Sequence, residues 1–258
     1  MTPSQLILTA LPGIPLIEPG DDLGAEIGEA LLRAGLKLVD GDVLAVTSKI
    51  VAKSEGRQVD LNDVTPSAEA LRLAAETHKD PRELEVILGE SRKVLRTRPG
   101  LIIVEHRLGF VCANAGVDHS NLAADGSTRA DRVLLLPENP DASAHALRER
   151  FVGQGGVDVG VLIVDSHGRA WRMGTVGVAI GVAGFPALVD LRGEPDLFGE
   201  ILQVTQIGLA DEIAGAASAL MGQADEGHPV VHVRGLPYPL RDGSLAELLR
   251  PEEKDLFR

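Results

Sequence analysis

Asp165 and Ser166 follow a run of apolar residues and are the first candidates for chemistry. Residues 157–164 are mostly branched and apolar, which is typical of a buried strand. A strand that ends in a carboxylate and a hydroxyl presents two hard oxygen ligands on a rigid support, and such ligands suit Mg²⁺ or Mn²⁺. Arg169 and Arg172 come next, and a guanidinium can pair with phosphate or carboxylate. The alternative is that Asp165 only caps a turn.

A second polar cluster follows another apolar run. Residues 43–46 predict a strand, and Thr47, Ser48, Lys49 and Lys53 come directly after it. Two hydroxyls and two ammonium groups can bind phosphate as hydrogen-bond donors. The alternative is a solvated strand end without a ligand.

A third polar segment is the loop NAGVDHSN, residues 114–121, which holds Asp118. It follows two apolar stretches, 101–104 and 108–113, that predict paired strands. Asp118 is therefore a second aspartate placed directly after a strand, with Asn121 close behind it.

The remaining chain predicts a mixture of strands and helices. Further strands are expected at 6–11, 133–136 and 230–233, and helices at 23–34, 67–78, 82–91, 141–151, 198–221 and 244–250. The uncharged run 173–189 contains four glycines and a proline, so it predicts tightly packed strand and turn instead of a membrane span. A sub-domain division is expected near residues 125–140, although it is weakly marked.

Composition restricts the class of protein. The 258 residues are 44% hydrophobic and only 3% aromatic, so a globular core must rest on aliphatic side chains. The net charge of −13 disfavours binding to nucleic acid or to an anionic membrane. A single cysteine excludes an intrachain disulfide and a cysteine-based zinc site, so a reducing, cytoplasmic location is expected. No Lys or Arg precedes Arg33, so the charged region of a signal peptide is not found there.

Several common nucleotide and metal motifs are absent from the sequence. There is no GxxxxGK[ST], no GxGxxG and no HExxH, so a nucleotide would not sit in a P-loop. His228 and His232 are interpreted as structural or exposed. His119 and His167 adjoin the two aspartates but are not assigned to the site, because loop histidines are common.

Six segments together resemble one family: LPGIPLI with PGDDL, DGDVLAVTSKIVAKSEGR, NAGVDHSN, VLIVDSHGRAWRMG, VTQIGLADEIA and VVHVRG. The family is coenzyme F420-0:L-glutamate ligase, also called coenzyme F420 gamma-glutamyl ligase. The resemblance extends from about residue 6 to the end, so residues 1–258 are expected to form the ligase domain. The closing LLRPEEKDLFR resembles the junction after which the actinobacterial form continues into a nitroreductase-like domain.

The resemblance implies an α+β fold with mixed sheets in two domains and an intertwined homodimer. It implies a GTP-dependent ligase that adds L-glutamate to the lactyl carboxylate of the deazaflavin precursor, and then further glutamates through gamma links, by way of an acyl phosphate. Two divalent cations, Mn²⁺ or Mg²⁺, and K⁺ are the expected cofactors. GTP, L-glutamate, the deazaflavin precursor and a second copy of the chain are the expected partners.

Site residues follow from the same motifs. The nucleotide would contact Ile14, Pro15, Leu16, Ile17, Ser48, Lys53 and Asn121. The metals would be held by Asp118, Asp165, Ser166 and Gln206. Asp118, Asp165 and Lys53 would be the catalytic residues: the two aspartates would hold the metals beside the phosphates, and Lys53 would add a fixed cation. Gln206 stands where the family usually has a glutamate, and Ser166 where a threonine is usual.

Two other functions remain open at this point. A metal-dependent phosphatase or nucleotide hydrolase would use the same aspartates without an acceptor. A non-catalytic binding protein would follow if Gln206 had removed activity.

Overall fold

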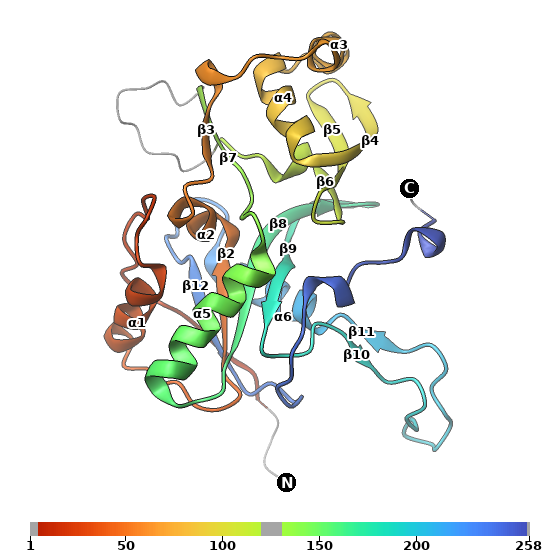
Figure 1. Ribbon diagram of the computed structural model, residues 1–258. Helices are drawn as coiled ribbons and strands as arrows, with labels where there is room; N and C mark the ends of the chain where they lie inside the picture. The colour runs from red at the N-terminus through yellow and green to blue at the C-terminus, as the bar shows by residue number, and fades with distance from the viewer. Residues whose placement is uncertain (1–4, 120–130, 257–258) are drawn as a thin grey trace.

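A five-stranded mixed sheet forms the centre of the fold (Figure 1). The structure, a computed structural model, describes residues 5–119 and 131–256. In spatial order the strands are β1 (Ile7–Ala10), β12 (Val230–Arg234), β2 (Val43–Thr47), β8 (Gly160–Arg169) and β9 (Arg172–Ala183). All neighbours are antiparallel except β2 and β8, which are parallel. Therefore β1, β2 and β8 run in one direction, and the ends of β1 and β2 lie along one edge, which we call the carboxyl edge.

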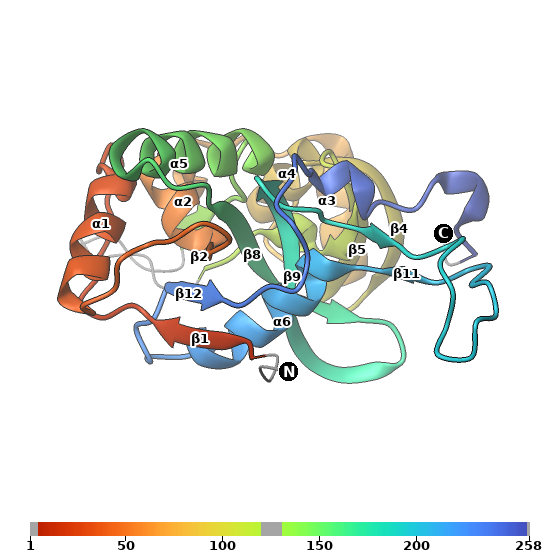
Figure 2. The ribbon, with the colours of Figure 1, turned by 90° about the horizontal axis from the view of Figure 1, so that it is seen from below.

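Helices cover both faces of this sheet (Figure 2). On one face lie α1 (Leu23–Arg33), α2 (Ser48–Ser54) and α5 (Pro140–Gly155), and on the other lies α6 (Leu209–Met221). Successive side chains of a strand point to opposite faces. Leu44 and Val46 accordingly pack in the cluster with α1 and α5, whereas Val43 and Ala45 pack in the cluster with α6.

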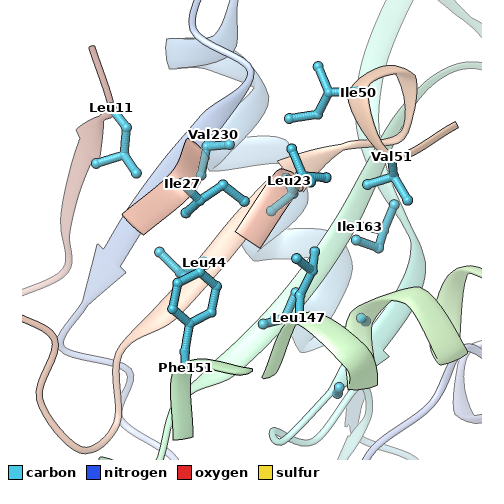
Figure 3. Close-up of a cluster of buried hydrophobic side chains, with 14 of the residues drawn as sticks. Leu11, Leu23, Ile27, Leu44, Ile50, Val51, Leu147, Phe151, Ile163 and Val230 are labelled. Atoms are coloured by element: carbon cyan, nitrogen blue, oxygen red, sulfur yellow. The ribbon is translucent and has the colours of Figure 1, made fainter. Parts of the chain in front are cut away.

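Figure 3 shows the first of these clusters, which is built from aliphatic side chains and one aromatic ring. Ile27 of α1, Leu44 of β2 and Ile163 of β8 are fully buried there, and Phe151 of α5 packs with them. Burying one such side chain stabilises the fold by about 1.5–3 kcal/mol. The expected aliphatic core is thus confirmed.

Polar residues begin and end the helices that frame this core. Asp22 accepts a hydrogen bond from the backbone N–H of Ala25 and so begins α1. Asn139 caps α5 in the same way, and Gly156 ends that helix in the left-handed region with φ 64°.

The described residues between 58 and 135, here called the insertion, lie between α2 and α5 and form a third hydrophobic cluster. Its elements are β3 (Gln58–Asp60), α3 (Ala68–Thr77), α4 (Pro81–Gly89), β4 (Ser91–Arg98), β5 (Leu101–His106), β6 (Val111–Ala113) and β7 (Arg132–Leu134). The chain returns to the main sheet at 135–139, within the range where a sub-domain division is expected. Whether the insertion is a separate domain stays a prediction.

Residues 189–207 form an arm beyond the main sheet (Figures 1 and 2). It contains the paired strands β10 (Val189–Asp190) and β11 (Gln206–Ile207). The helix predicted over 198–221 is therefore wrong in its first half. Asp196 accepts hydrogen bonds from the backbone N–H groups of Phe198 and Glu200, and this closes a turn where the helix was expected.

Three further elements differ from the expectation. Residues 48–54, expected as the polar end of a strand, form the short helix α2. Strand β8 does not end at Asp165 but continues to Arg169, because β9 pairs with it in a long hairpin. Strand β4 was not predicted, since half of its sequence SRKVLRTR is charged. Short 3₁₀ helices are η1 (Leu61–Asp63), η2 (Asn114–Gly116), η4 (Leu245–Glu247) and η5 (Glu252–Lys254).

The glycine-rich run 173–189 packs inside the chain for most of its length. A Cβ atom at Gly177 would stand 2.4 Å from the carbonyl oxygen of Ala214, and one at Gly181 would stand 2.4 Å from that of Pro140. The expected tight packing is confirmed, and residues 179–187 are buried, so they offer no surface to a second subunit. Within the described ranges, no helix has the length and apolar character needed to cross a membrane. The fold is α+β with mixed sheets, as expected, and the homodimer stays a prediction.

Candidate active site

A pocket of about 330 Å³ opens at the carboxyl edge of the main sheet. Four segments line it: residues 14–17 after β1, residues 47–53 at the end of β2 and in α2, residues 164–166 of β8, and residues from 218 to 229 between α6 and β12. Ligands of open α/β sheets commonly bind outside the carboxyl ends of the strands. The expected residues Ile14, Pro15, Leu16, Ile17, Ser48, Lys53, Asp165 and Ser166 all lie on its wall.

Ser48 and Asp165 meet because β2 and β8 are neighbours. Thr47 pairs with Val164, so the next residue of each strand stands at the same level. The Ser48 hydroxyl, which is 2% exposed as a residue, donates a hydrogen bond of 2.7 Å to Oδ1 of Asp165. Two residues 117 positions apart in the chain are thus joined at the pocket.

Asp165 is held as a carboxylate. Nε2 of His167 lies 2.9 Å from Oδ2 of Asp165, and the aspartate side chain is 13% exposed. Burial would raise the pKa of Asp165, but His167, Ser48 and a backbone N–H together lower it below its usual value. An ionised carboxylate fixed on both oxygens is suited to bind a cation or to orient a phosphate.

Rings from the insertion pack behind this carboxylate. The ring of Phe110 lies 5.3 Å from that of His167, measured between centroids, and stacks on the fully buried His106 at 5.1 Å. Nδ1 of His106 accepts a hydrogen bond from the backbone N–H of Leu108, which fixes the ring orientation. The insertion therefore helps to support the histidine that contacts Asp165.

Asp118 reaches the site from the insertion through a strained turn. Asn114, Ala115 and Gly116 adopt φ values of 51°, 51° and 68°, a left-handed run that an alanine rarely enters. The backbone of Asp118 then exchanges hydrogen bonds with Leu134 of β7. Its Oδ2 lies 2.5 Å from Nζ of Lys49.

The two aspartates therefore approach consecutive residues of one short helix. Ser48 contacts Asp165, and Lys49 contacts Asp118. Lys53, one turn later, is 8% exposed and lines the pocket. Burial lowers the pKa of Lys53, Glu18 opposes this shift and Lys49 adds to it. Two cations and two carboxylates are thus gathered beside the pocket, an arrangement that can bind the phosphates of a nucleotide together with a metal.

The oxygen donors present suit a hard divalent cation. They are the carboxylates of Asp118 and Asp165 and the exposed hydroxyl of Ser166. Among residues 5–119 and 131–256, no group of three or more His, Cys, Asp or Glu side chains could hold a metal ion by itself. A cation here would therefore take its other ligands from phosphate or water, as Mg²⁺ usually does.

Gln206 does not line this pocket. It lies on β11, opposite Asp190 of β10, and is exposed. The pocket is reached by the end of α6 that carries Ser218 and Met221, whereas Gln206 precedes the other end. At 1.5 Å per residue, the 13 residues of that helix span about 20 Å. A metal role for Gln206 stays a prediction, and Asn121 lies outside the described residues.

Arg169 and Arg172 also lie away from the pocket. Both are exposed at the tip of the β8–β9 hairpin, where Arg169 donates a hydrogen bond to the carbonyl oxygen of Gly174. Nothing in their surroundings supports the phosphate-pairing interpretation. His232 is confirmed as structural, because it is 1% exposed and lies 2.9 Å from Asp42 near the opposite edge of the sheet.

Sequence reasoning missed one pairing and two contributors to the site. Lys49 was expected to bind phosphate with Lys53, but its pairing with Asp118, 69 residues away, cannot be read from spacing. His167 was set aside as an ordinary loop histidine, although it lies in β8 and contacts Asp165. The segment 222–229 was assigned no role in the site, and His228 within it was interpreted as structural or exposed; it is exposed and lines the pocket. Glycines of this segment allow the left-handed φ of 75° at Gly222 and 69° at Gly227.

Comparisons with known proteins show the family of this chain. Residues 13–235 match the family model described as F420-0:Gamma-glutamyl ligase. Coenzyme F420:L-glutamate ligase of Methanothermobacter thermautotrophicus is 46% identical over 253 residues, which cover 97% of this chain and 98% of the relative. The protein of that name from Methanopyrus kandleri is 47% identical, with 94% and 93% covered. That from Methanocaldococcus jannaschii is 43% identical, with 91% and 92% covered. The chain therefore belongs to the F420-0:gamma-glutamyl ligase family and is a ligase.

Proposed function

We propose that this chain uses GTP to join L-glutamate to the deazaflavin coenzyme F420-0 during coenzyme F420 biosynthesis. The first glutamate is added to the lactyl carboxylate, and later ones are added through gamma links. The observation that carries the proposal is the convergence of Ser48, Lys49, Lys53 and Asp165 on one pocket, with Asp118 paired to Lys49. The description of the matching family model supplies the acceptor F420-0, and the names of the similar archaeal proteins supply the amino acid.

Activation of the carboxylate requires phosphoryl transfer. A carboxylate does not react with an amine at neutral pH, so the lactyl carboxylate first attacks the γ-phosphate of GTP and gives an acyl phosphate and GDP. The amine of glutamate then attacks the acyl carbon, and inorganic phosphate leaves. Phosphoryl transfer depends mainly on positioning and on neutralisation of charge.

The pocket supplies both requirements from fixed side chains. Lys53 is held in place by its burial and provides an ammonium group for phosphate oxygens. Asp165 is oriented on both oxygens, by Ser48 and His167, and Asp118 by Lys49. These two carboxylates with Ser166 would hold Mg²⁺ or Mn²⁺, which supplies positive charge to the γ-phosphate when bound. K⁺ as a further cofactor stays a prediction without assigned ligands.

Cations at the pocket would allow this acidic protein to bind anionic substrates. The chain carries a net charge of −13, yet GTP, glutamate and the acceptor are all anionic. Lys49 and Lys53 line the pocket, and a divalent cation would add to their charge. The local field at the pocket is then opposite in sign to that of the whole protein.

Exposed apolar side chains on the arm and on the β8–β9 hairpin support a homodimer. Leu197 and Phe198 of the arm are 99% and 92% exposed, and Trp171 and Met173 of the hairpin are 88% and 95% exposed. Exposed apolar side chains of this size, gathered on two extensions, are typical of a subunit interface. Gln206 lies on the same arm, so a role at the metal of this pocket would require the arm to reach the pocket of a second subunit.

The test is mass spectrometry of products formed from GTP, Mn²⁺, glutamate and the deazaflavin precursor. We expect glutamylated products and release of phosphate that requires both the acceptor and glutamate. Asp165→Asn should abolish both, whereas Asp255→Asn, a carboxylate near the end of the chain, should not. Equal GTP turnover without acceptor and glutamate would contradict the proposal and would indicate a metal-dependent nucleotide hydrolase.

A further inference from the structure

The pocket has two halves with different chemistry. Ser48, Lys49 and Asp165, the charged and hydrogen-bonding end, lie where β2 and β8 reach the carboxyl edge. Residues 14–17 and 222–229 lie at the other end, because β1 and β12 are the next strands of the sheet. If the phosphates occupy the first half, the base of the nucleotide occupies the second.

The second half offers an apolar platform and one uncommitted carboxylate. Leu16 lines the pocket and is 83% exposed, as a side chain that contacts a planar base would be before binding. Gln223 donates to the Ser218 hydroxyl, and the His228 ring lies 3.3 Å from the carbonyl oxygen of Leu220. Asp225 also lines the pocket, is exposed, and forms no hydrogen bond or ion pair with any residue that the structure describes.

The loop that carries Asp225 is shaped by other residues. Gly222 and Gly227 take left-handed φ values, and Glu226 accepts a hydrogen bond of 2.8 Å from the backbone N–H of Ala224. Asp225 therefore does not stabilise the loop conformation through a hydrogen bond.

A carboxylate in a pocket for an anionic nucleotide weakens binding by charge repulsion, unless the carboxylate is paired with hydrogen-bond donors on the base.

We infer that Asp225 sets the preference for guanine by accepting hydrogen bonds from N1–H and from the 2-amino group. These two donors are adjacent on the guanine edge, and the two oxygens of a carboxylate match them. Adenine has an acceptor at N1, so its N1 and the carboxylate oxygen would repel each other instead of forming a hydrogen bond. The inference rests on the proposed use of GTP and identifies the residue that selects it.

Binding of GTP, ITP and XTP to wild type and to Asp225→Asn tests this inference, with nucleotide dissociation constants measured by calorimetry in the presence of Mn²⁺. ITP lacks the 2-amino group, and XTP replaces it with a carbonyl oxygen. Wild type should bind GTP roughly tenfold or more tightly than ITP or XTP, because each charge-assisted hydrogen bond contributes strongly. Asparagine can accept from N1–H and donate to the carbonyl of xanthine, so the variant should bind XTP better than GTP.

Glu226→Gln is the matched control. It removes the same charge from the same loop, but the side chain faces the backbone of Ala224, and the amide oxygen can still accept that bond. An effect of charge alone would appear equally in both variants and for all three nucleotides. Only Asp225→Asn should reverse the order of GTP and XTP.

The outcomes separate this inference from the proposed function. If wild type binds GTP but does not distinguish it from ITP, or if Asp225→Asn keeps the preference for GTP, the inference is overturned and the proposed function stands. If wild type binds no guanine nucleotide, both are overturned. The comparison of GTP with ITP on wild type needs no variant and so holds even if a substitution disturbs folding.

Discussion

Replacement of Lys53 by methionine should weaken GTP binding while leaving the fold intact. Lys53 lines the pocket and is only 8% exposed, so most of its side chain is packed. Methionine fills a similar volume without the charge. A hydrogen bond from a charged donor is worth about 1.5–3 kcal/mol, which converts to a rise of roughly 10- to 150-fold in the GTP dissociation constant.

The same substitution should weaken GTP binding without lowering the free energy of unfolding near neutral pH. Burial lowers the pKa of Lys53 below 10.5, so the unfolded chain binds this proton more tightly than the folded protein does. The free energy of unfolding of wild type should therefore rise as the pH increases from the lowered pKa towards 10.5, and methionine removes that dependence. Near neutral pH the variant should be at least as stable as wild type, and its advantage should shrink as the pH rises.

Calorimetric GTP titration and urea unfolding at several pH values measure these two effects. Lys93→Met, an exposed lysine of β4, is the control and should change neither. An unchanged GTP constant would remove Lys53 from the phosphate site. A large loss of stability at neutral pH would instead show that its charge supports the fold.

Three further changes test other parts of the account. Asp118→Asn should abolish turnover at saturating Mn²⁺ with an unchanged circular dichroism spectrum; near wild-type turnover would exclude it as a ligand. Asp42→Ala should cost about 3–5 kcal/mol in urea unfolding without changing the GTP constant, because it strips the buried partner of Arg234 and His232. Despite burial, the pKa of Asp42 is lowered by these partners, so its contribution should be present at neutral pH and lost as the pH falls below about 4. Phe198→Asp should convert a homodimer into a monomer by light scattering, and a monomeric wild type would contradict the interface.

The sequence predicted the parts of the fold that depend on local pattern. Apolar runs identified β2, β8 and β12, since these strands are buried on both faces. The helices expected at 23–34 and 141–151 are present as α1 and α5. The polar residues at the ends of apolar runs, Ser48 and Asp165, are indeed brought together.

Long-range pairing could not be predicted in the same way. Asp165 was expected at a strand end, but β9 extends that strand because the pairing continues past the sheet edge. Residues 48–54 contain Ile50 and Val51, which favour a strand locally, yet they form α2 because both side chains pack into the core beside α1 and α5. A helix was expected over the arm because of its apolar residues, but a turn closed by Asp196 lies there instead.

Transfer of oxygen from the acceptor to phosphate tests the central claim most directly. The deazaflavin precursor, labelled with ¹⁸O in its lactyl carboxylate, is incubated with GTP, Mn²⁺, glutamate and the protein, and the released phosphate is analysed by mass spectrometry. An acyl phosphate formed at this pocket predicts one ¹⁸O atom in the phosphate released with the first glutamate, because the lactyl oxygen that attacks the γ-phosphate leaves with it, whereas phosphate from later gamma links carries no label. Phosphate that carries no ¹⁸O while GTP is consumed would contradict the account.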